Sequence, residues 1–289
     1  MTHEPLPPTL YRVQIEPLVR QALAEDLGRA GDLTSDAIIP PGTTCRAALV
    51  ARASGRLAGL DPSLLAFELL APEIRAERCA ADGEDVEPGC VLARLDGPAR
   101  AVLAAERTAL NLLGHLSGVA TTTREVVRAI AGSGARVVCT RKTTPGLRAL
   151  EKYAVRMGGG ANHRFGLDDA ILIKDNHRAL AGGVVPAIRR ARESAGHLVK
   201  IEVEVDALAD LELALAEGID AVLLDNMPLA TLREAVALVA GRVVTEASGG
   251  ITPARAPAVA ATGVDLLSIG WLTHSAPNLD VALDVDPPV

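Results

Sequence analysis

The second half of the chain repeats one pattern, a short apolar run followed by a helical stretch. Six such runs lie at residues 135–140, 170–174, 199–205, 221–225, 243–247 and 266–269. Amphipathic helical spacing fills the intervals at residues 184–194, 208–217 and 229–240. Strands that alternate with helices build a parallel sheet. Runs this apolar are typical of strands buried on both faces, so the pattern predicts an α/β barrel of the triose-phosphate-isomerase type, in incomplete form.

The residues before this repeat predict a small α+β unit. A helical stretch over 16–27 closes at Gly28, and a loop is expected at 31–35. Short strands bounded by glycines are expected at 44–53 and 89–95, with a helix over 62–70 between them. A longer helix is predicted over 99–116, and its polar stripe consists of Arg107, Asn111 and His115 at spacings of four residues.

Composition excludes several classes of protein. The net charge of −7 argues against a generic nucleic-acid binder, because recognition of backbone phosphates usually requires a basic domain. No run reaches the roughly 20 apolar residues that span a bilayer, and the first residues lack the pattern of a targeting signal. Cys45, Cys79, Cys90 and Cys139 form no metal-binding or disulfide pattern. We therefore expect a cytoplasmic protein with reduced thiols.

Polar residues follow each apolar run, at what would be the carboxyl end of a strand. These ends meet at one mouth in an α/β barrel, and the chemistry of such enzymes takes place there. Charges beside buried strands need partners or a cleft, so a whole set of them indicates a site. The candidates are a cationic wall of Arg141, Lys142, His163, Arg164 and Lys174, and an acidic pair of Glu204 and Asp225.

The two halves of this mouth suit different ligand groups. Arginine offers a fork to carboxylate or phosphate and lysine offers a point charge, so the cationic wall predicts a polyanionic ligand. The acidic pair suits ribose hydroxyls, a magnesium ion or developing positive charge. Two glycine-containing turns, Ser248-Gly249-Gly250 and Ser268-Ile269-Gly270, follow the last two runs, where barrels commonly hold a phosphate with backbone N–H groups.

Other functions fit part of this pattern. A lysine at a strand end is how Schiff-base aldolases place their nucleophile, so Lys174 could serve in an aldolase. The cations around Lys174 and the phosphate-type turns argue against that interpretation. A barrel that binds its ligands without turning them over is the non-enzymatic alternative.

Eight stretches resemble the quinolinate phosphoribosyltransferase family, also called nicotinate-nucleotide pyrophosphorylase. They run in order over about nine-tenths of the chain: EDLGRAGDLTSD (25–36), AERTALNLLGHLSGVAT (105–121), TRKTTPGLRALEKYAVRMGGGANHR (140–164), IKDNH (173–177), IEVEVD (201–206), LLDNM (223–227), EASGGI (246–251) and SIGWLTHS (268–275). A related subfamily of phosphoribosyltransferase-like proteins linked to molybdenum uptake is a closer rival than the aldolase. The intact TRKT and NHR stretches favour quinolinate.

The resemblance implies an architecture. A small N-terminal α/β sandwich (residues 1–115, to which 276–289 return) packs on an incomplete α/β barrel (116–275). It also implies a homodimer in which Arg107 of one subunit enters the partner's site. The family uses Mg²⁺ and converts quinolinate and phosphoribosyl pyrophosphate into nicotinate mononucleotide, pyrophosphate and CO₂.

The resemblance also assigns roles to matched residues. Thr140 belongs to the substrate-binding set. Lys142, Lys174, Glu204 and Asp225 form the catalytic set. The quinolinate carboxylates are expected at Arg107, Arg141, His163, Arg164 and Lys174, with Lys142 also facing the pyrophosphate. Glu204 and Asp225 would hold the ribose hydroxyls and Mg²⁺, and the 5′-phosphate would lie on Ser248, Gly249, Gly250, Ser268 and Gly270.

Overall fold

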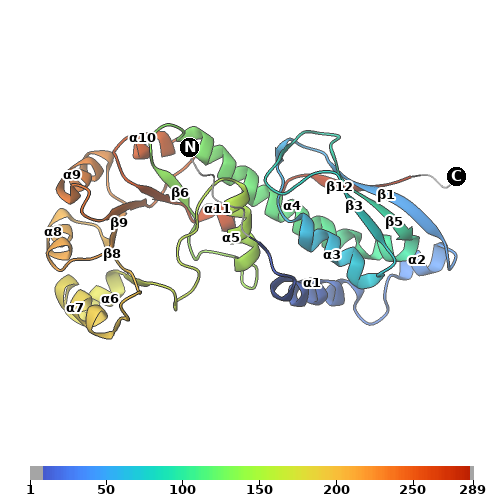
Figure 1. Ribbon diagram of the computed structural model, residues 1–289, viewed down its shortest axis with the longest axis horizontal. Helices are drawn as coiled ribbons and strands as arrows, with labels where there is room; N and C mark the ends of the chain where they lie inside the picture. The colour runs from blue at the N-terminus through green and yellow to red at the C-terminus, as the bar shows by residue number, and fades with distance from the viewer. Residues whose placement is uncertain (1–8, 287–289) are drawn as a thin grey trace. The chain divides into compact units, whose positions relative to one another are not determined.

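The computed structural model describes residues 9–286, which form two compact units (Figure 1). Within that range, unit 1 comprises residues 9–124, 144–159 and 273–286, and unit 2 comprises 125–143 and 160–272.

Segment 144–159 belongs to unit 1 through its contacts. Helix α5 (Arg148–Met157) places Glu151 2.9 Å from His115 Nε2, and Tyr153 donates a hydrogen bond to Asp82 at 2.7 Å. The sequence-based division at residues 115 and 116 assigns this segment to the barrel instead. That division remains a prediction about domains, whereas the units record which residues pack together.

Unit 2 is built on a six-stranded parallel sheet, in the order β6-β11-β10-β9-β8-β7 (Figure 1). Its strands are β6 (Arg136–Val138), β7 (Ile171–Ile173), β8 (Ile201–Val205), β9 (Ala221–Asp225), β10 (Val244–Ser248) and β11 (Leu266–Ser268). Its helices are α6 (Asp175–Ala181), α7 (Val184–Ser194), α8 (Leu208–Ala216), α9 (Leu229–Val239), α10 (Ala256–Ala260) and α11 (Trp271–His274), of which the last crosses into unit 1 at Thr273. The predicted incomplete α/β barrel is confirmed.

The two faces of this sheet differ in chemistry. Residues that pair in register point to the same face, and side chains alternate between faces along each strand. One face carries Val137, Val203, Val222, Leu224 and Leu267, which join the apolar sides of α7, α8 and α9 in a single core. The opposite face carries most of the polar side chains of the strands, and the candidate site lies there.

Unit 1 has an antiparallel sheet in the order β12-β1-β5-β3, together with a small pair of β2 and β4. Its strands are β1 (Thr44–Ala51), β2 (Gly55–Arg56), β3 (Arg75–Arg78), β4 (Asp85–Val86), β5 (Val91–Pro98) and β12 (Val281–Val285). Its helices are α1 (Arg12–Leu27), α2 (Leu33–Ile38), α3 (Leu60–Leu70), α4 (Ala99–Ala129, whose last residues enter unit 2) and α5. No helix among residues 9–286 is long and apolar enough to cross a membrane.

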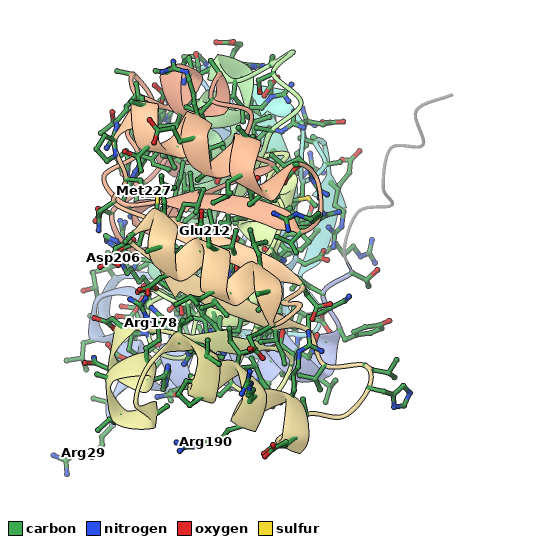
Figure 2. The ribbon with its side chains drawn as sticks, turned by 90° about the vertical axis from the view of Figure 1, so that its left-hand side faces the viewer. Arg29, Arg178, Arg190, Asp206, Glu212 and Met227 are labelled. Atoms are coloured by element: carbon green, nitrogen blue, oxygen red, sulfur yellow. The ribbon has the colours of Figure 1, made fainter. Side chains whose placement is uncertain are left out.

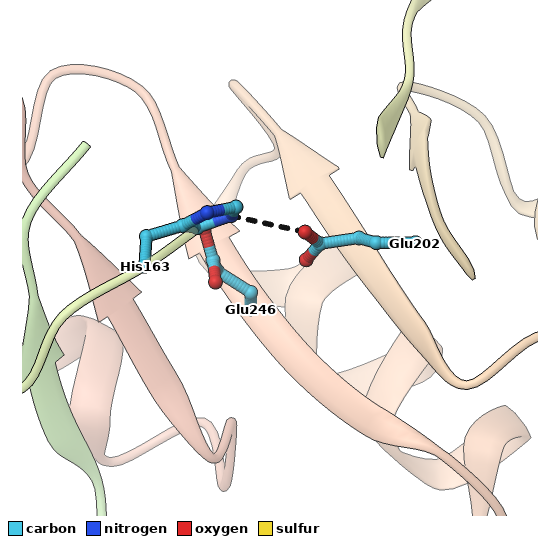
Figure 3. Close-up of side chains that lie close together, drawn as sticks. All are labelled: His163, Glu202 and Glu246. Carbon is cyan, nitrogen blue, oxygen red and sulfur yellow. Dashed lines mark ion pairs between the residues drawn. The ribbon is translucent and has the colours of Figure 1, made fainter. Parts of the chain in front are cut away.

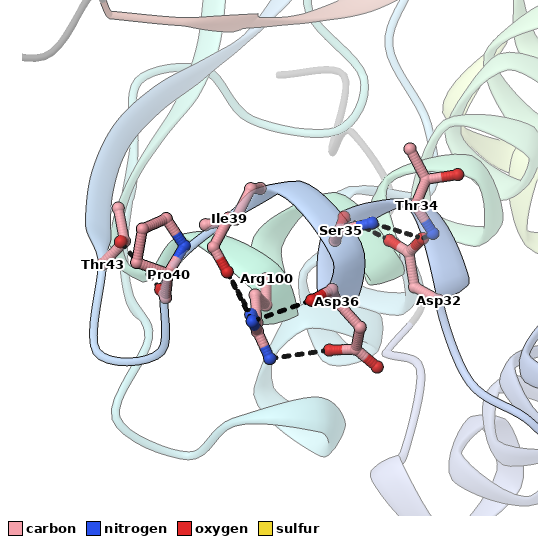
Figure 4. Close-up of polar contacts among 8 residues, drawn as sticks. All are labelled: Asp32, Thr34, Ser35, Asp36, Ile39, Pro40, Thr43 and Arg100. Atoms are coloured by element: carbon pink, nitrogen blue, oxygen red, sulfur yellow. Dashed lines mark hydrogen bonds and ion pairs between the residues drawn. The ribbon is translucent and has the colours of Figure 1, made fainter.

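The prediction of a loop at residues 31–35 is wrong, because helix α2 begins at Leu33 (Figure 4). Asp32 accepts hydrogen bonds from the backbone N–H groups of Thr34 and Ser35 at 3.1 and 3.0 Å, which satisfies two donors of the first turn. Arg100 fixes the other end of α2 by donating to Asp36 and to the carbonyl of Ile39. Asp, Thr and Ser favour loops and helix caps alike, so this stretch does not distinguish the two by composition.

Helix α4 carries a groove of small residues that the chain crosses after Thr273. A Cβ atom at Gly118 would lie 2.1 Å from the Pro277 carbonyl oxygen, and one at Gly114 would lie 2.9 Å from the Leu279 carbonyl oxygen. The Leu279 N–H donates to the Gly114 carbonyl at 2.9 Å. This crossing leads the chain into β12, which pairs antiparallel with β1.

Candidate functional site

Three of the predicted site residues lie side by side at the carboxyl end of the sheet. Ser248 of β10 is in register with Asp225 of β9 on one side and with Ser268 of β11 on the other. The next position in this row is Val138 of β6. The row therefore combines a carboxylate and two hydroxyls on the polar face.

Glu204 interacts with Lys174 and with Asp225, the carboxylate of this row. Lys174 Nζ lies 3.6 Å from Glu204 Oε2. Burial raises the pKa of Glu204, the ammonium of Lys174 opposes that change, and the charge of Asp225 adds to it. Two carboxylates that repel each other next to a cation form a site suited to a positively charged group.

The local fold around α6 positions Lys174. Lys174 is the N-cap of α6, and its backbone N–H donates to His177 Nδ1 at 3.0 Å. Arg178 in the same helix donates to Asp210 of α8 at 2.5 Å and lies 3.7 Å from Asp206. Figure 2 labels Arg178 and Asp206. These ion pairs fix α6 to the start of α8, so the direction in which Lys174 leaves the sheet is set by the fold.

Arg141 and Arg164 form a half-buried cationic pair. Burial lowers the pKa of the Arg164 guanidinium, and the charge of Arg141 lowers it further. Arg164 Nη1 donates to the Ala170 carbonyl at 3.0 Å. The Nε atoms of both arginines are buried, and neither has a hydrogen-bond partner within the described residues. Unsatisfied buried donors beside a like charge indicate a place for an anion.

The turn after β10 is rigid, and it requires glycine. Gly249 has a φ of 97°, and a Cβ there would lie 2.0 Å from the Asn226 side-chain oxygen. Asn226 donates from its backbone to the Ser248 carbonyl at 3.0 Å, while Arg255 donates to the carbonyls of Gly249 and Gly250 at 3.3 Å each. Backbone that is held in this way and carries no side chain at Gly249 can approach a ligand closely.

The remaining predicted residues lie in three places. Thr140 follows β6, and its hydroxyl accepts from the Lys142 backbone N–H at 3.0 Å. Gly270 follows β11. Arg107 is in unit 1, on α4, with a side chain that is 65% exposed and 4.0 Å from Glu106.

His163 contacts two carboxylates of the sheet, and its place in the cationic wall stays a prediction. Its side chain is 12% exposed, and its Nε2 lies 3.0 Å from Glu202 Oε2 and 3.6 Å from Glu246 Oε1 (Figure 3). Its Nδ1 accepts from the Arg164 backbone N–H at 2.7 Å. Burial and the nearby charge of Glu202 raise the pKa of Glu246 to about 7.

Glu202 and Glu246 are functional candidates that the sequence prediction missed. Glu202 lies two residues before Glu204 in the IEVEV strand, and Glu246 lies two residues before Ser248. Alternate strand residues share a face, so a predicted site residue indicates that its i−2 neighbour faces the same side. The carboxylates two residues before Glu204 and Ser248 were the signal available in the sequence.

Two family models match the chain. Residues 32–117 match the quinolinate phosphoribosyl transferase N-terminal domain, and residues 119–284 match the C-terminal domain of the same enzyme.

Individual relatives extend over almost the whole chain. A probable nicotinate-nucleotide pyrophosphorylase [carboxylating] of Bacillus subtilis is 46% identical and covers 96% of this chain and 95% of its own. The nicotinate-nucleotide pyrophosphorylase [carboxylating] of Mycobacterium leprae is 45% identical, and the match covers 92% of this chain and 95% of that protein. The solved structure of the nicotinate-nucleotide pyrophosphorylase from Francisella tularensis matches with a TM-score of 0.92 at 37% identity. The match covers 96% of this chain and 98% of that chain. The chain therefore belongs to the quinolinate phosphoribosyl transferase family.

Proposed function

We propose that this protein transfers the phosphoribosyl group of phosphoribosyl pyrophosphate to quinolinate and releases CO₂, giving nicotinate mononucleotide and pyrophosphate for NAD biosynthesis. The observation that carries the proposal is the division of one sheet edge into three parts. An arginine pair whose Nε donors are buried and unsatisfied, a carboxylate pair, and a row of hydroxyls beside a glycine turn match the dicarboxylate, ribose and phosphate of these substrates.

The quinolinate carboxylates bind to the cations. The Nε donors of Arg141 and Arg164 are buried and lack acceptors within the described residues, and a dicarboxylate supplies acceptors. Lys174 adds a third cation, and Lys142 faces the pyrophosphate. His163 adjoins this wall, because its Nδ1 accepts from the backbone N–H of Arg164.

Glu204 and Asp225 hold the ribose hydroxyls and fit a magnesium ion. Their oxygens are the donors that Mg²⁺ prefers, and the charge of Asp225 raises the pKa of Glu204, a repulsion that a cation relieves. When bound, Mg²⁺ neutralises charge on the pyrophosphate leaving group. Ser248, Ser268 and the turns at Gly249-Gly250 and Gly270 hold the 5′-phosphate.

The chain's own groups then account for the chemistry. Loss of pyrophosphate gives the ribose carbon oxocarbenium character, which the carboxylates of Glu204 and Asp225 stabilise. The pyridine nitrogen attacks this carbon and becomes positively charged. The 2-carboxylate leaves as CO₂, because the carbanion that remains is next to the positive nitrogen. Protonation of that carbon completes the product.

Arg107 acts across a homodimer interface in this proposal. Its side chain is 65% exposed, with Nη2 4.0 Å from Glu106 Oε1, so the guanidinium is available to a second copy of the chain. Each active site of the homodimer then receives one Arg107 from the partner subunit. We place this homodimer in the cytoplasm.

The deciding experiment measures nicotinate mononucleotide formed from quinolinate and phosphoribosyl pyrophosphate, with nicotinate as the control substrate. We expect product from quinolinate only, because nicotinate leaves part of the cationic wall unpaired, at a cost of about 1–3 kcal/mol. Comparable turnover of nicotinate contradicts the proposed specificity. Absence of pyrophosphate release identifies a binding protein, and borohydride trapping at Lys174 identifies the Schiff-base aldolase.

A further inference from the structure

The ring of His163 connects two strands that are not neighbours. Glu202 belongs to β8 and Glu246 to β10, and β9 runs between them. At this level β9 presents Ala221 and Leu223, which cannot bind the carboxylates. The His163 ring lies over this position, with Nε2 directed toward both carboxylates (Figure 3).

The backbone before His163 is fixed to the same sheet. Ala161 forms a parallel bridge with Val138 of β6, and its N–H donates to the Val137 carbonyl at 2.8 Å. The Cys139 N–H in turn donates to the Ala161 carbonyl at 3.2 Å. The segment is therefore anchored to β6, whereas the His163 side chain reaches β8 and β10.

The proton on the ring is located by its partners. His163 Nδ1 accepts from the Arg164 N–H at 2.7 Å, so Nδ1 carries a lone pair and the proton lies on Nε2. An Nε2–H group donates to Glu202 Oε2 at 3.0 Å, whereas Glu246 Oε1 lies beyond hydrogen-bond distance at 3.6 Å. One histidine and two glutamates within 4.8 Å also have the composition of a divalent-cation site. A cation requires the lone pair on Nε2, however, so the Arg164 N–H favours a hydrogen-bonded cluster over a metal site.

We propose that Glu202 and Glu246 are positioning residues, which hold the His163 ring and, through its Nδ1, the backbone from which Arg164 extends toward the substrate. This inference rests on the proposed function, because it assigns the oriented guanidinium to quinolinate. The link is short: carboxylate to Nε2–H, and Nδ1 to the Arg164 N–H. The Arg164 side chain is then held at its far end by the Ala170 carbonyl, at 3.0 Å from Nη1.

The cluster keeps one oxygen unsatisfied. Glu246 Oε1 is buried and has no hydrogen-bond partner within the described residues, and at 3.6 Å it is farther from Nε2 than Glu202 Oε2 is. A single Nε2 proton cannot fully satisfy both carboxylates. Native proteins tolerate such a group mainly where function requires it. Glu202 is therefore the acceptor for Nε2–H, and Glu246 acts on the ring through its nearby charge.

The experiment compares near-isosteric substitutions that differ in the acceptor. Glu202→Gln keeps a side-chain oxygen that can accept from Nε2–H, whereas Glu202→Leu removes it. We expect Glu202→Leu to raise the KM for quinolinate about tenfold or more, with the KM for phosphoribosyl pyrophosphate changed less than about threefold. Glu202→Gln should stay within about threefold of wild type for both substrates. Glu246→Leu should also raise the KM for quinolinate more than the KM for phosphoribosyl pyrophosphate, but by a smaller factor. This variant replaces Glu202→Leu in the test if Glu202→Leu does not fold.

A matched control separates positioning from general disturbance of the sheet. Thr245 is the neighbour of Glu246 in β10 but points to the opposite face, where its hydroxyl lies 2.7 Å from Asp265. Thr245→Val removes that contact and should not raise the KM for quinolinate relative to the KM for phosphoribosyl pyrophosphate. Equal effects of the Gln and Leu variants, or equal increases in both KM values, overturn the proposal.

A spectroscopic readout tests the cluster without activity. Long-range ¹H–¹⁵N spectra, with His163→Gln for assignment, should show the Nε2–H form of His163 in wild type and a loss of that preference in Glu202→Leu. An Nδ1–H form in wild type overturns the proposal, as does stoichiometric Zn²⁺ binding that Glu202→Gln abolishes. Failure of the proposed function appears separately, as absence of quinolinate-dependent pyrophosphate release from the wild-type enzyme.

Discussion

Glu246 shows how a single residue of the site opposes folding. Its carboxyl group is 2% exposed and has an oxygen without a partner within the described residues, so ionisation is costly in the folded protein. The same environment raises its pKa from the usual value near 4.5 to about 7. The folded state therefore binds the proton more tightly than the unfolded state does.

The sign of the resulting pH dependence follows from this difference. Between about pH 4.5 and 7 the folded state holds more protons at this group, so stability falls as the pH rises and the loss is complete above pH 7. Glu246→Gln cannot ionise, and we expect it to be more stable than wild type at pH 8 by up to about 3 kcal/mol. At pH 4.5 the two should be nearly equal. Denaturant unfolding at both pH values measures this, and a difference that does not grow with pH contradicts the assignment.

The sequence predicted most of the residues at the polar sheet edge but not the contacts among them. Asp225, Ser248 and Ser268 could be predicted together because strand ends of a parallel sheet meet at one edge. The partners of His163 could not, because its loop lies in the connection between β6 and β7, and it meets β8 and β10 only in the tertiary structure. The orientation of a side chain on such a loop depends on tertiary contacts that no periodicity encodes.

At the scale of secondary structure, the buried elements were predictable and the exposed ones were not. Strand β9 and helix α7 have the predicted bounds, because an apolar run or an amphipathic period marks each. Strand β3 was missed, since its four residues are all exposed and carry no alternation. Helix α4 extends beyond the predicted residue 116 to Ala129, where the small residues of its groove obscure the helical period.

That groove gives a prediction about helix α4. A Cβ at Gly118 would lie 2.1 Å from a backbone oxygen, and backbone cannot move aside as a flexible side chain does. We expect Gly118→Ala to destabilise the protein by about 1–3 kcal/mol, measured as a fall in Tm. Gly196→Ala is the matched control, because a Cβ there meets nothing within 4 Å. Equal Tm values for both variants would show that the segment at Pro277 shifts at little cost.

At the scale of the whole molecule, the proposed homodimer can be tested by mixing inactive subunits. If Arg107 completes the partner's site, Arg107→Ala and Lys174→Ala are each inactive as homodimers, and a mixed dimer has one site with both native residues. Random exchange makes about half of the dimers mixed, so about one quarter of wild-type activity should return. The measurement is turnover after verified subunit exchange. No recovery would place Arg107 in its own subunit's site or outside any site.

The pairing of β12 with β1 imposes an order of completion on a chain that is translated from its N-terminus. Every residue of unit 2 precedes β12 in the chain, so the ribosome releases all of unit 2 before it releases the strand that borders β1. Domains generally fold as units while they emerge. Unit 2 can complete its sheet during translation, whereas β1 keeps one edge open until residues 281–285 arrive. The unit whose synthesis begins first is the one that is finished last.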